Sequence, residues 1–218
     1  PHASSSAASD VYKRQPYGGT FLIFSDYCKP SIRLSALMGL KVIYVFSHDS
    51  IGLGEDGPTH QPIEQLAGLR AIPNLNVFRP ADINETFECW ELALKNENTP
   101  SAIALSRQKV PYINPKNSKE NKCEKGAYVV NLTSHESNVT LVASGTEVEL
   151  ALKVQEKLKE NNIHSKVVSM PCMELFDKQP EDYRKDILEE NSLIITIEAG
   201  GVMSWQKYIK NKGANLGI

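Results

Sequence analysis

The strongest constraint on the fold is a regular alternation of two kinds of segment along the chain. Short runs of β-branched and aromatic residues alternate with segments whose apolar residues recur at helical spacing. The expected strands are 41–46, 76–78, 101–105, 139–143, 166–169 and 193–197. The expected helices lie within 16–40 and at 63–72, 83–95, 147–161, 183–190 and 200–210. Strands that alternate with helices normally pair in parallel, so we predict an α/β protein with mostly parallel sheets covered by helices on both faces.

Two of the expected helices begin with the pattern of a capping box. Asp82 precedes Glu85 by three positions, and Thr146 precedes Glu149 by three. In a capping box the first side chain accepts a hydrogen bond from the backbone N–H three residues later, and the glutamate reaches back. We therefore expect Asp82 and Thr146 to be helix N-caps.

The alternation divides the chain into two consecutive α/β units. Residues 108–126 are polar, contain two prolines and lack periodicity, so they are predicted to be a linker between units 16–107 and 127–218. Residues 1–15 are set aside as a disordered tail or an adapter-derived sequence, because DVYKRQ resembles a translated sequencing-library adapter. Both ends look cut: a new strand is expected to begin near 213, just before the sequence stops.

Composition narrows the class of protein. The 218 residues include 24 basic and 26 acidic side chains, and no long basic block is present, which disfavours a nucleic-acid partner. The apolar runs are too short to cross a bilayer, and no secretory signal opens the sequence. The four cysteines are far apart and form no CxxC pair, which disfavours a zinc site and a disulfide framework. We therefore expect a cytoplasmic protein without a membrane partner.

Two side chains follow expected strands at the point where ligands bind to parallel sheets. His48 follows strand 41–46, and Arg107 follows strand 101–105. The carboxyl ends of parallel strands share one edge of the sheet, so these residues are expected to lie at the same edge. An arginine fork and a histidine N–H suit an anionic group such as a phosphate. On position alone, ordinary capping or salt-bridge roles remain open.

The loop from His48 to Pro62 is rich in glycine and in polar groups. Gly52, Gly54 and Gly57 permit backbone conformations that other residues resist, while Asp56 and His60 add a carboxylate and an imidazole. A plain turn with Asp56 bonded to its own backbone is one interpretation. A long polar loop at the carboxyl end of a strand favours a ligand site instead.

The sequence of this loop, HDSIGLGEDGPTHQP, resembles the signature of the transketolase pyrimidine-binding domain. The HDSIGLGED portion favours transketolase over deoxyxylulose-phosphate synthase. The similarity extends from Gly19 to Gly217 and includes TFLIFSDY, RPAD, LSRQ, ASGTEVELA, VVSMPCMELFDKQ and EAG. It implies a thiamine-diphosphate-binding pyrimidine domain followed by a transketolase C-terminal-like domain.

The resemblance also implies a role for each candidate side chain. Three aromatic residues match those that hold the aminopyrimidine ring of thiamine diphosphate, with the second of them stacking on it: Phe21, Phe24 and Tyr27. Without the resemblance, Phe21 and Phe24 would be assigned to core packing. His48 and Arg107 match phosphate-binding residues. Asp56 matches an aspartate that recognises a substrate hydroxyl, and His60 matches a catalytic histidine positioned for proton transfer.

The implied activity is transfer of a two-carbon ketol unit from a ketose phosphate to an aldose phosphate in the pentose phosphate pathway. In the family, Mg²⁺ or Ca²⁺ holds the cofactor through a GDG-type motif in another domain, so no metal ligand is expected in this chain. In the family, a glutamate upstream of the TFLIF segment also bonds the pyrimidine nitrogen of the cofactor. This sequence contains no GDG-type motif, and it has no glutamate before Glu55. The family's homodimer completes each site from two subunits, so the chain alone is predicted to be inactive.

Two alternatives remain open. One is a dihydroxyacetone synthase, which shares the signature and uses formaldehyde as acceptor. The other is a non-catalytic transketolase-like interaction module. In the second unit no chemical site is assigned: His135 and His164 are expected to face solvent, and Glu198 follows a strand without a visible partner. By resemblance this unit serves structure and the dimer interface.

Overall fold

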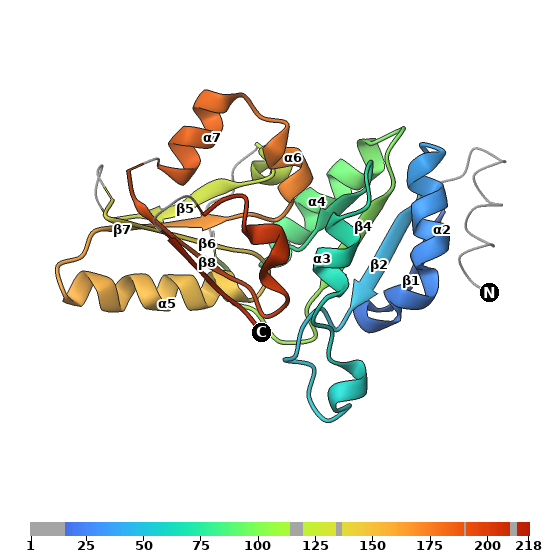
Figure 1. Ribbon diagram of the computed structural model, residues 1–218, viewed down its shortest axis with the longest axis horizontal. Helices are drawn as coiled ribbons and strands as arrows, with labels where there is room; N and C mark the ends of the chain where they lie inside the picture. The colour runs from blue at the N-terminus through green and yellow to red at the C-terminus, as the bar shows by residue number, and fades with distance from the viewer. Residues whose placement is uncertain (1–15, 114–119, 134–136, 190, 210–212) are drawn as a thin grey trace.

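The computed structural model describes residues 16–113, 120–133, 137–189, 191–209 and 213–218, which form two sheets side by side (Figure 1). The first sheet has the strand order β1-β2-β4-β3 and is parallel throughout. Its strands are β1 (Tyr17–Phe21), β2 (Ile43–Ser47), β3 (Asn76–Phe78) and β4 (Ser101–Leu105). The second has the order β5-β7-β6-β8-β9 and is parallel except for its edge strand β5. The predicted α/β class with mostly parallel sheets is confirmed.

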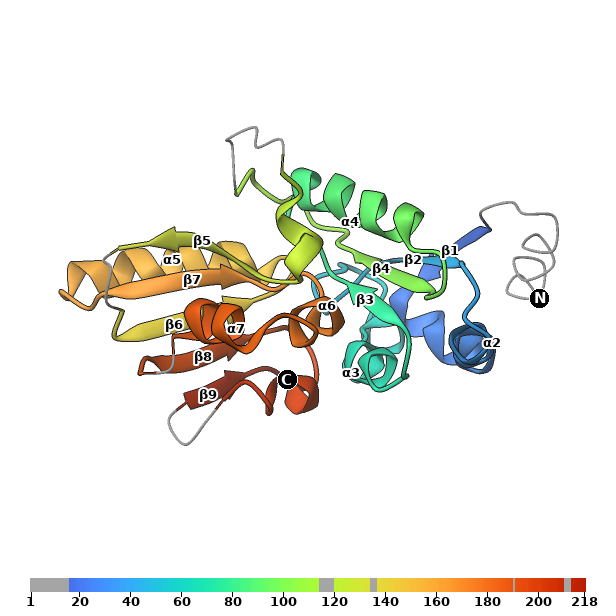
Figure 2. The same cartoon turned by 90° about the horizontal axis from the view of Figure 1, so that it is seen from above.

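Helices cover both faces of the first sheet. The covering helices are α2 (Ser25–Leu37), α3 (Gln65–Arg70) and α4 (Ile83–Lys95); the 3-10 turn η1 (Leu22–Phe24) directly precedes α2, and the 3-10 turn η2 (Pro58–His60) lies within the loop between β2 and α3. Figure 2 shows α4 on one face and α2 with α3 on the other. Alternate residues of β2 face the two layers: Tyr44 and Phe46 pack with α2 and α3, and Ile43 packs with Cys89 of α4. This two-residue period is the geometry of a strand buried on both faces.

The second sheet is also covered on both faces. Its strands are β5 (Tyr128–Leu132), β6 (Val139–Ala143), β7 (Ser165–Ser169), β8 (Leu193–Ile197) and β9 (Gly213–Leu216). Its helices are η3 (Lys122–Lys125), α5 (Glu147–Glu160), α6 (Met173–Asp177), α7 (Glu181–Leu188) and η4 (Val202–Trp205). One core lies between the sheet and α5, and the other lies between the sheet and α6 with α7.

Several sequence predictions match the structure residue for residue. The strands at 76–78, 101–105, 139–143 and 193–197 and the helix at 83–95 have the predicted bounds. Asp82 caps α4 by accepting a hydrogen bond from Glu85 N at 2.9 Å. The Glu85 side chain, however, accepts from Ala81 N rather than reaching back to Asp82 N. The strand expected near 213 is present as β9.

Two predictions about helices need correction. Thr146 is at the N-cap position of α5, as predicted, but its side chain makes no capping hydrogen bond, because its hydroxyl donates to the Glu147 carboxylate. The helix expected at 200–210 is only the 3-10 turn η4 in the described residues. There the backbone N–H of Gly201 donates to Ile63 O, and Trp205 is buried in the core. These tertiary contacts hold the segment out of a regular helix.

Two sequence predictions concern segments that the structure describes only in part or not at all. The tail at 1–15 and residues 114–119 of the expected linker lie outside the described residues. The remainder of the linker contains η3. In the portion of the chain that is described, no helix combines the length and apolarity needed to cross a membrane.

Candidate functional site

The carboxyl ends of β2 and β4 bring the two expected anion-binding side chains to one edge of the first sheet. The two strands are neighbours in the sheet, and Ser47 at the end of β2 pairs with Leu105 at the end of β4. His48 is the next residue after β2, and Arg107 follows β4 by two residues. The parallel register therefore places both at the same edge despite 59 positions between them in sequence, the difference between 107 and 48.

Five rings gather beside this edge. Phe21, at the end of β1, stacks on His48 with centroids 3.7 Å apart, and it stacks on Phe24 at 5.9 Å. Phe24 in turn contacts Tyr27 at 6.1 Å and meets His60 edge-on at 5.3 Å. Five of the seven candidate residues thus form one aromatic cluster built from β1, η1, α2 and both ends of the glycine-rich loop. Core packing alone does not describe this group, because Tyr27 is 85% exposed.

The two histidines of the cluster are held in the same way. His48 Nδ1 lies 3.1 Å from Ser47 Oγ, and His60 Nδ1 lies 2.9 Å from Thr59 Oγ1. In each case the hydroxyl of the preceding residue fixes one ring nitrogen. The Nε2 atom of each ring remains available to a ligand, because no hydrogen bond joins it to another described residue. This arrangement suits a histidine that binds a ligand or that exchanges a proton with one.

The glycines of the loop make room for the residues that follow β4. A Cβ on Gly54, whose φ is +97°, would lie 3.5 Å from Arg107 Nη1. A Cβ on Gly52 would lie only 2.5 Å from the Gln108 side chain. The bare glycine backbone therefore lets Arg107 and Gln108 lie against the loop. Asp56 on this loop and Arg107 after β4 are both exposed.

The backbone of His48 is itself unusual. Its φ is +58°, a left-handed conformation that costs a non-glycine residue about 1–2 kcal/mol. Such a residue persists only where its surroundings fix it. The next residue, Asp49, is buried and accepts a hydrogen bond from Arg79 Nε at 2.9 Å. Sequence reasoning missed this ion pair. The only available signal was the RPAD motif that contains Arg79.

Glu198, for which the sequence shows no partner, has hydrogen-bond partners in the structure. Arg70 donates to both of its carboxylate oxygens, at 2.7 and 2.8 Å, and Trp205 Nε1 donates to Oε2 at 2.8 Å. Burial alone would raise the pKa of Glu198, but the Arg70 and Arg79 guanidinium groups lower it to about 2. The pairing was invisible in the sequence because Arg70 and Glu198 come from different units. His164 is exposed, as expected, and His135 lies outside the described residues.

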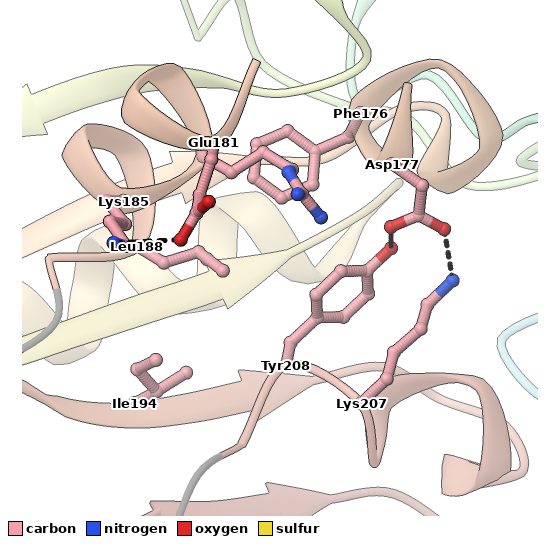
Figure 3. A pocket seen from close by; sticks show the side chains of 9 residues that line it. Phe176, Asp177, Glu181, Lys185, Leu188, Ile194, Lys207 and Tyr208 are labelled. Atoms are coloured by element: carbon pink, nitrogen blue, oxygen red, sulfur yellow. Dashed lines mark hydrogen bonds and ion pairs between the residues drawn. The ribbon is translucent and has the colours of Figure 1, made fainter. Parts of the chain in front are cut away.

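The second unit contains a cavity of about 280 Å³ between α6, α7 and β8 (Figure 3). Two of its charged pairs are internal: Lys207 pairs with Asp177, which also accepts from Tyr208 Oη at 2.9 Å, and Lys185 pairs with Glu181 at 2.8 Å. Arg184 also lines the cavity, and its buried Nε has no hydrogen-bond partner among the described residues. None of the candidate residues lines this cavity. In the described residues, no cluster of three or more side chains is arranged to hold a metal ion.

Comparison with models of known protein families shows the family to which the chain belongs. The model of the transketolase pyrimidine-binding domain matches residues 4–112, and that of the transketolase-like C-terminal domain matches residues 126–218. The chain belongs to the transketolase family. The first match contains the aromatic cluster and the glycine-rich loop, and the second contains the whole sheet of the second unit.

Relatives in this family are longer than the chain. The transketolase of Sinorhizobium medicae is 54% identical over 204 residues, which are 93% of this chain and 29% of that protein. The chain thus spans about three-tenths of the length of the curated relatives it matches. Among solved structures, a Pichia stipitis transketolase in complex with sedoheptulose 7-phosphate matches with a TM-score of 0.87 and 41% identity over 94% of this chain and 29% of its own.

A more distant match has the same fold in a different arrangement of genes. A split-gene transketolase, described as an inactive β4 tetramer, covers 100% of this chain and 70% of its own, with a TM-score of 0.74 and 23% identity. At that identity the likeness establishes the fold alone.

Proposed function

We propose that this chain provides the substrate and pyrimidine side of a ketol-transfer site. In this site a two-carbon unit passes from a ketose phosphate to an aldose phosphate with the help of thiamine diphosphate. The observation that carries the proposal is the aromatic cluster of Phe21, Phe24, Tyr27, His48 and His60 at the edge where Arg107 also lies. Because the chain spans about three-tenths of its relatives, it supplies only part of the site.

The free aromatic surface fits a flat heterocycle. Phe21 is already stacked between His48 and Phe24, so it supports its neighbours. Phe24 and Tyr27 are the rings with surface left for a pyrimidine, which stacking binds without a charge. Bound thiamine diphosphate would supply the carbanion chemistry of the reaction. Its metal, Mg²⁺ or Ca²⁺, would be held by residues outside this chain.

The charges at the edge suit a sugar phosphate. Arg107 presents an exposed guanidinium and His48 an available Nε2, which together would bind the phosphate. Asp56, on the glycine-rich loop, would accept a hydrogen bond from a sugar hydroxyl and would repel a phosphate placed there. The substrate is therefore oriented with its phosphate toward Arg107. The sedoheptulose 7-phosphate bound by the Pichia stipitis relative supports this class of substrate.

His60 is the residue that would transfer a proton to or from a substrate hydroxyl. The Thr59 hydroxyl holds its Nδ1, and Phe24 packs against its ring, so Nε2 is directed by contacts on two sides. It would take a proton from, or return one to, a substrate hydroxyl as the carbon bond breaks or forms. The intact enzyme would be a cytoplasmic homodimer, and the chain alone would be inactive.

A chimera tests the proposal. Residues 16–218 replace the matching part of Bacillus subtilis transketolase, to which the chain is 50% identical. We expect the chimera to convert xylulose 5-phosphate and ribose 5-phosphate, and the isolated chain not to. His60→Asn should lower kcat by about 10²–10⁴-fold, while the matched control His164→Asn, at an exposed site, should leave it unchanged. Turnover by the isolated chain, or a folded chimera without activity, would contradict the proposal.

Two further arms of the same assay test the substrate. Arg107→Gln should raise KM for phosphorylated substrates and leave nearly unchanged the transfer from hydroxypyruvate to glycolaldehyde, a donor and an acceptor that both lack a phosphate. Formaldehyde as acceptor distinguishes a transketolase from a dihydroxyacetone synthase. Faster turnover with formaldehyde than with ribose 5-phosphate would favour the synthase.

A further inference from the structure

The carboxyl ends of both sheets face one another across five buried charged residues. The first unit (β1 to β4) contributes one carboxylate and two guanidinium groups, and the second (β5 to β9) contributes two carboxylates. We call this set the inter-unit charge cluster: Asp49, Arg70, Arg79, Glu147 and Glu198. Ligands normally occupy the carboxyl edge of a parallel sheet. In the second unit that edge is occupied by arginines of the first unit.

Arg79 is the centre of the cluster. Its side chain is completely buried, and it follows β3 directly. Nε donates to Asp49, while Nη1 pairs with Glu147 and donates to the carbonyl oxygen of Ser144 at 3.0 Å. Glu198 lies 3.6 Å from the same nitrogen. One side of the guanidinium thus holds the first unit's loop, and the other side is held by the second unit.

The backbone of the second unit is shaped for this side chain. Gly145, with φ +58°, lies so close that a Cβ would be 2.8 Å from the Arg79 guanidinium carbon. Its N–H also donates to Arg79 O at 3.0 Å. The turn between β6 and α5 therefore fits around Arg79, and the contact depends on the absence of a side chain there.

Stability alone is a poor explanation for so many buried charges. Desolvating an ion pair costs about as much as the attraction returns, and apolar residues of the same volume often give equal or greater stability. Charges held in fixed positions instead set the orientation of the groups that they bind. Here the group at the end of the cluster is Asp49. Its neighbour His48 has a left-handed backbone and stacks on Phe21 at 3.7 Å.

We propose that Arg79 is a positioning residue for His48, held in place by Glu147 and Glu198 of the second unit. Arg79 fixes Asp49, and Asp49 fixes the backbone on which the His48 ring is carried. The second unit then has a function in the site although none of its side chains joins the aromatic cluster. The significance of His48 rests on the function proposed above, whereas the mechanical link from Glu147 to His48 does not.

Nuclear magnetic resonance of the full chain tests this link. The ring signals of His48 and the exchange rate of the Asp49 amide hydrogen are measured in the wild type and in Glu147→Gln. This substitution removes one charge from a side chain that is 11% exposed, a mild change for a buried cluster. We expect the His48 signals to shift and the Asp49 amide to exchange about tenfold faster, which corresponds to ~1.4 kcal/mol of lost local stability.

The matched control is Glu189→Gln. Glu189 pairs with Lys166 at 3.0 Å within the second unit, away from the cluster. It should lower the melting temperature without moving the His48 signals. Unchanged His48 signals in Glu147→Gln, or equal shifts in both variants, would overturn the proposal. Asp49→Asn provides a second route: its effect on His48 and that of Glu147→Gln should be non-additive in the double variant.

One more measurement separates this inference from the proposed function. Xylulose 5-phosphate is added to the wild-type chain while the His48 signals are followed. If Glu147→Gln moves them and the sugar phosphate does not, His48 is positioned by Arg79 but does not bind phosphate in this chain. If the sugar phosphate moves them and Glu147→Gln does not, phosphate binding stands and the positioning role is wrong.

Discussion

At the scale of single residues, Glu85 shows how strongly burial in the fold changes the pKa of a carboxyl group. Its carboxylate is buried between the units, where Oε1 accepts from Tyr128 Oη at 2.9 Å and from Ser169 Oγ at 2.6 Å. Oε2 accepts from Ala81 N at 2.7 Å. Burial nevertheless raises the pKa of Glu85 to about 7, because three hydrogen bonds only partly replace the lost water.

This pKa predicts a specific dependence of stability on pH. Between the ordinary value of 4.5 and about 7, the folded protein binds the proton of Glu85 more tightly than the unfolded chain does. The free energy of unfolding contributed by Glu85 should therefore fall as pH rises through this window and stay constant above it. At about 1.4 kcal/mol per pKa unit the total change is on the order of 3 kcal/mol.

Urea denaturation of the wild type and Glu85→Gln at several values between about pH 5 and about pH 8 measures this change. A glutamine can donate to the two hydroxyls and still accept from Ala81 N. The difference in stability between the two proteins should shrink or invert as pH rises. Glu97→Gln, at an exposed site, is the control and should show no such trend. A difference that does not change with pH would contradict the prediction.

Individual residues also show which parts of the site could be predicted from the sequence. His48 and Arg107 could be placed together because the edge rule for parallel strands needs only the order of strands and helices. The partners of Asp49 and Glu198 could not be found in this way. Arg79 is 30 positions from Asp49 and Arg70 is 128 from Glu198, and a single long-range pair leaves no periodic signal. The aromatic cluster was assigned to a cofactor only through the family resemblance.

At the scale of elements, buried parallel strands were predicted best. Each is a short, mainly apolar run bounded by polar or loop residues, and the predicted bounds at 76–78, 101–105, 139–143 and 193–197 agree with the structure. The strand β1, YGGTF, was missed because two glycines weaken its propensity. The edge strand β5 pairs antiparallel with a shift in register between Val129 and Asn131, which breaks the alternation. Five-residue α6 is too short to show a helical period.

Gly126 carries a prediction about how the linker packs on α6. It follows η3 with φ +80°, and a Cβ there would lie 2.2 Å from Phe176 N and 2.4 Å from the Cys172 carbonyl oxygen. Gly57 is a matched control: its φ is +75°, and no atom of the described residues lies within 4 Å of its Cβ position. Both alanine substitutions strain the backbone, but only the one at Gly126 also collides with main chain that cannot move aside.

We therefore expect Gly57→Ala to lower the free energy of unfolding by about 1–3 kcal/mol. Gly126→Ala should cost more than about 4 kcal/mol, since overpacking adds to the strain. Denaturation in urea compares the two directly. Equal losses would mean that α6 and the linker can separate without affecting the rest of the fold.

At the scale of the whole molecule, α2 leaves an apolar surface uncovered. Leu34, Leu37 and Met38 lie three and four positions apart, which places them on one face of the helix end, and Leu37 and Met38 are 73% and 65% exposed. A contiguous exposed apolar surface usually marks a contact with another protein. The other face of α2 already packs on the first sheet through Ile32 and Ala36. A second copy of this chain is the partner we expect here, in line with the homodimer proposed above.

Sedimentation measurements on the isolated chain test this expectation. The wild type should associate as its concentration rises, because burying the leucine and methionine side chains returns about 25 cal/mol for each Å² removed from water. Leu37→Lys should abolish the association, since a lysine cannot be buried there without a partner for its charge. Leu150→Lys on α5, at a site 49% exposed, controls for adding charge to an exposed leucine and should associate like the wild type. If the wild type stays monomeric at every concentration, the α2 surface does not bind a second copy of this chain and the prediction is wrong.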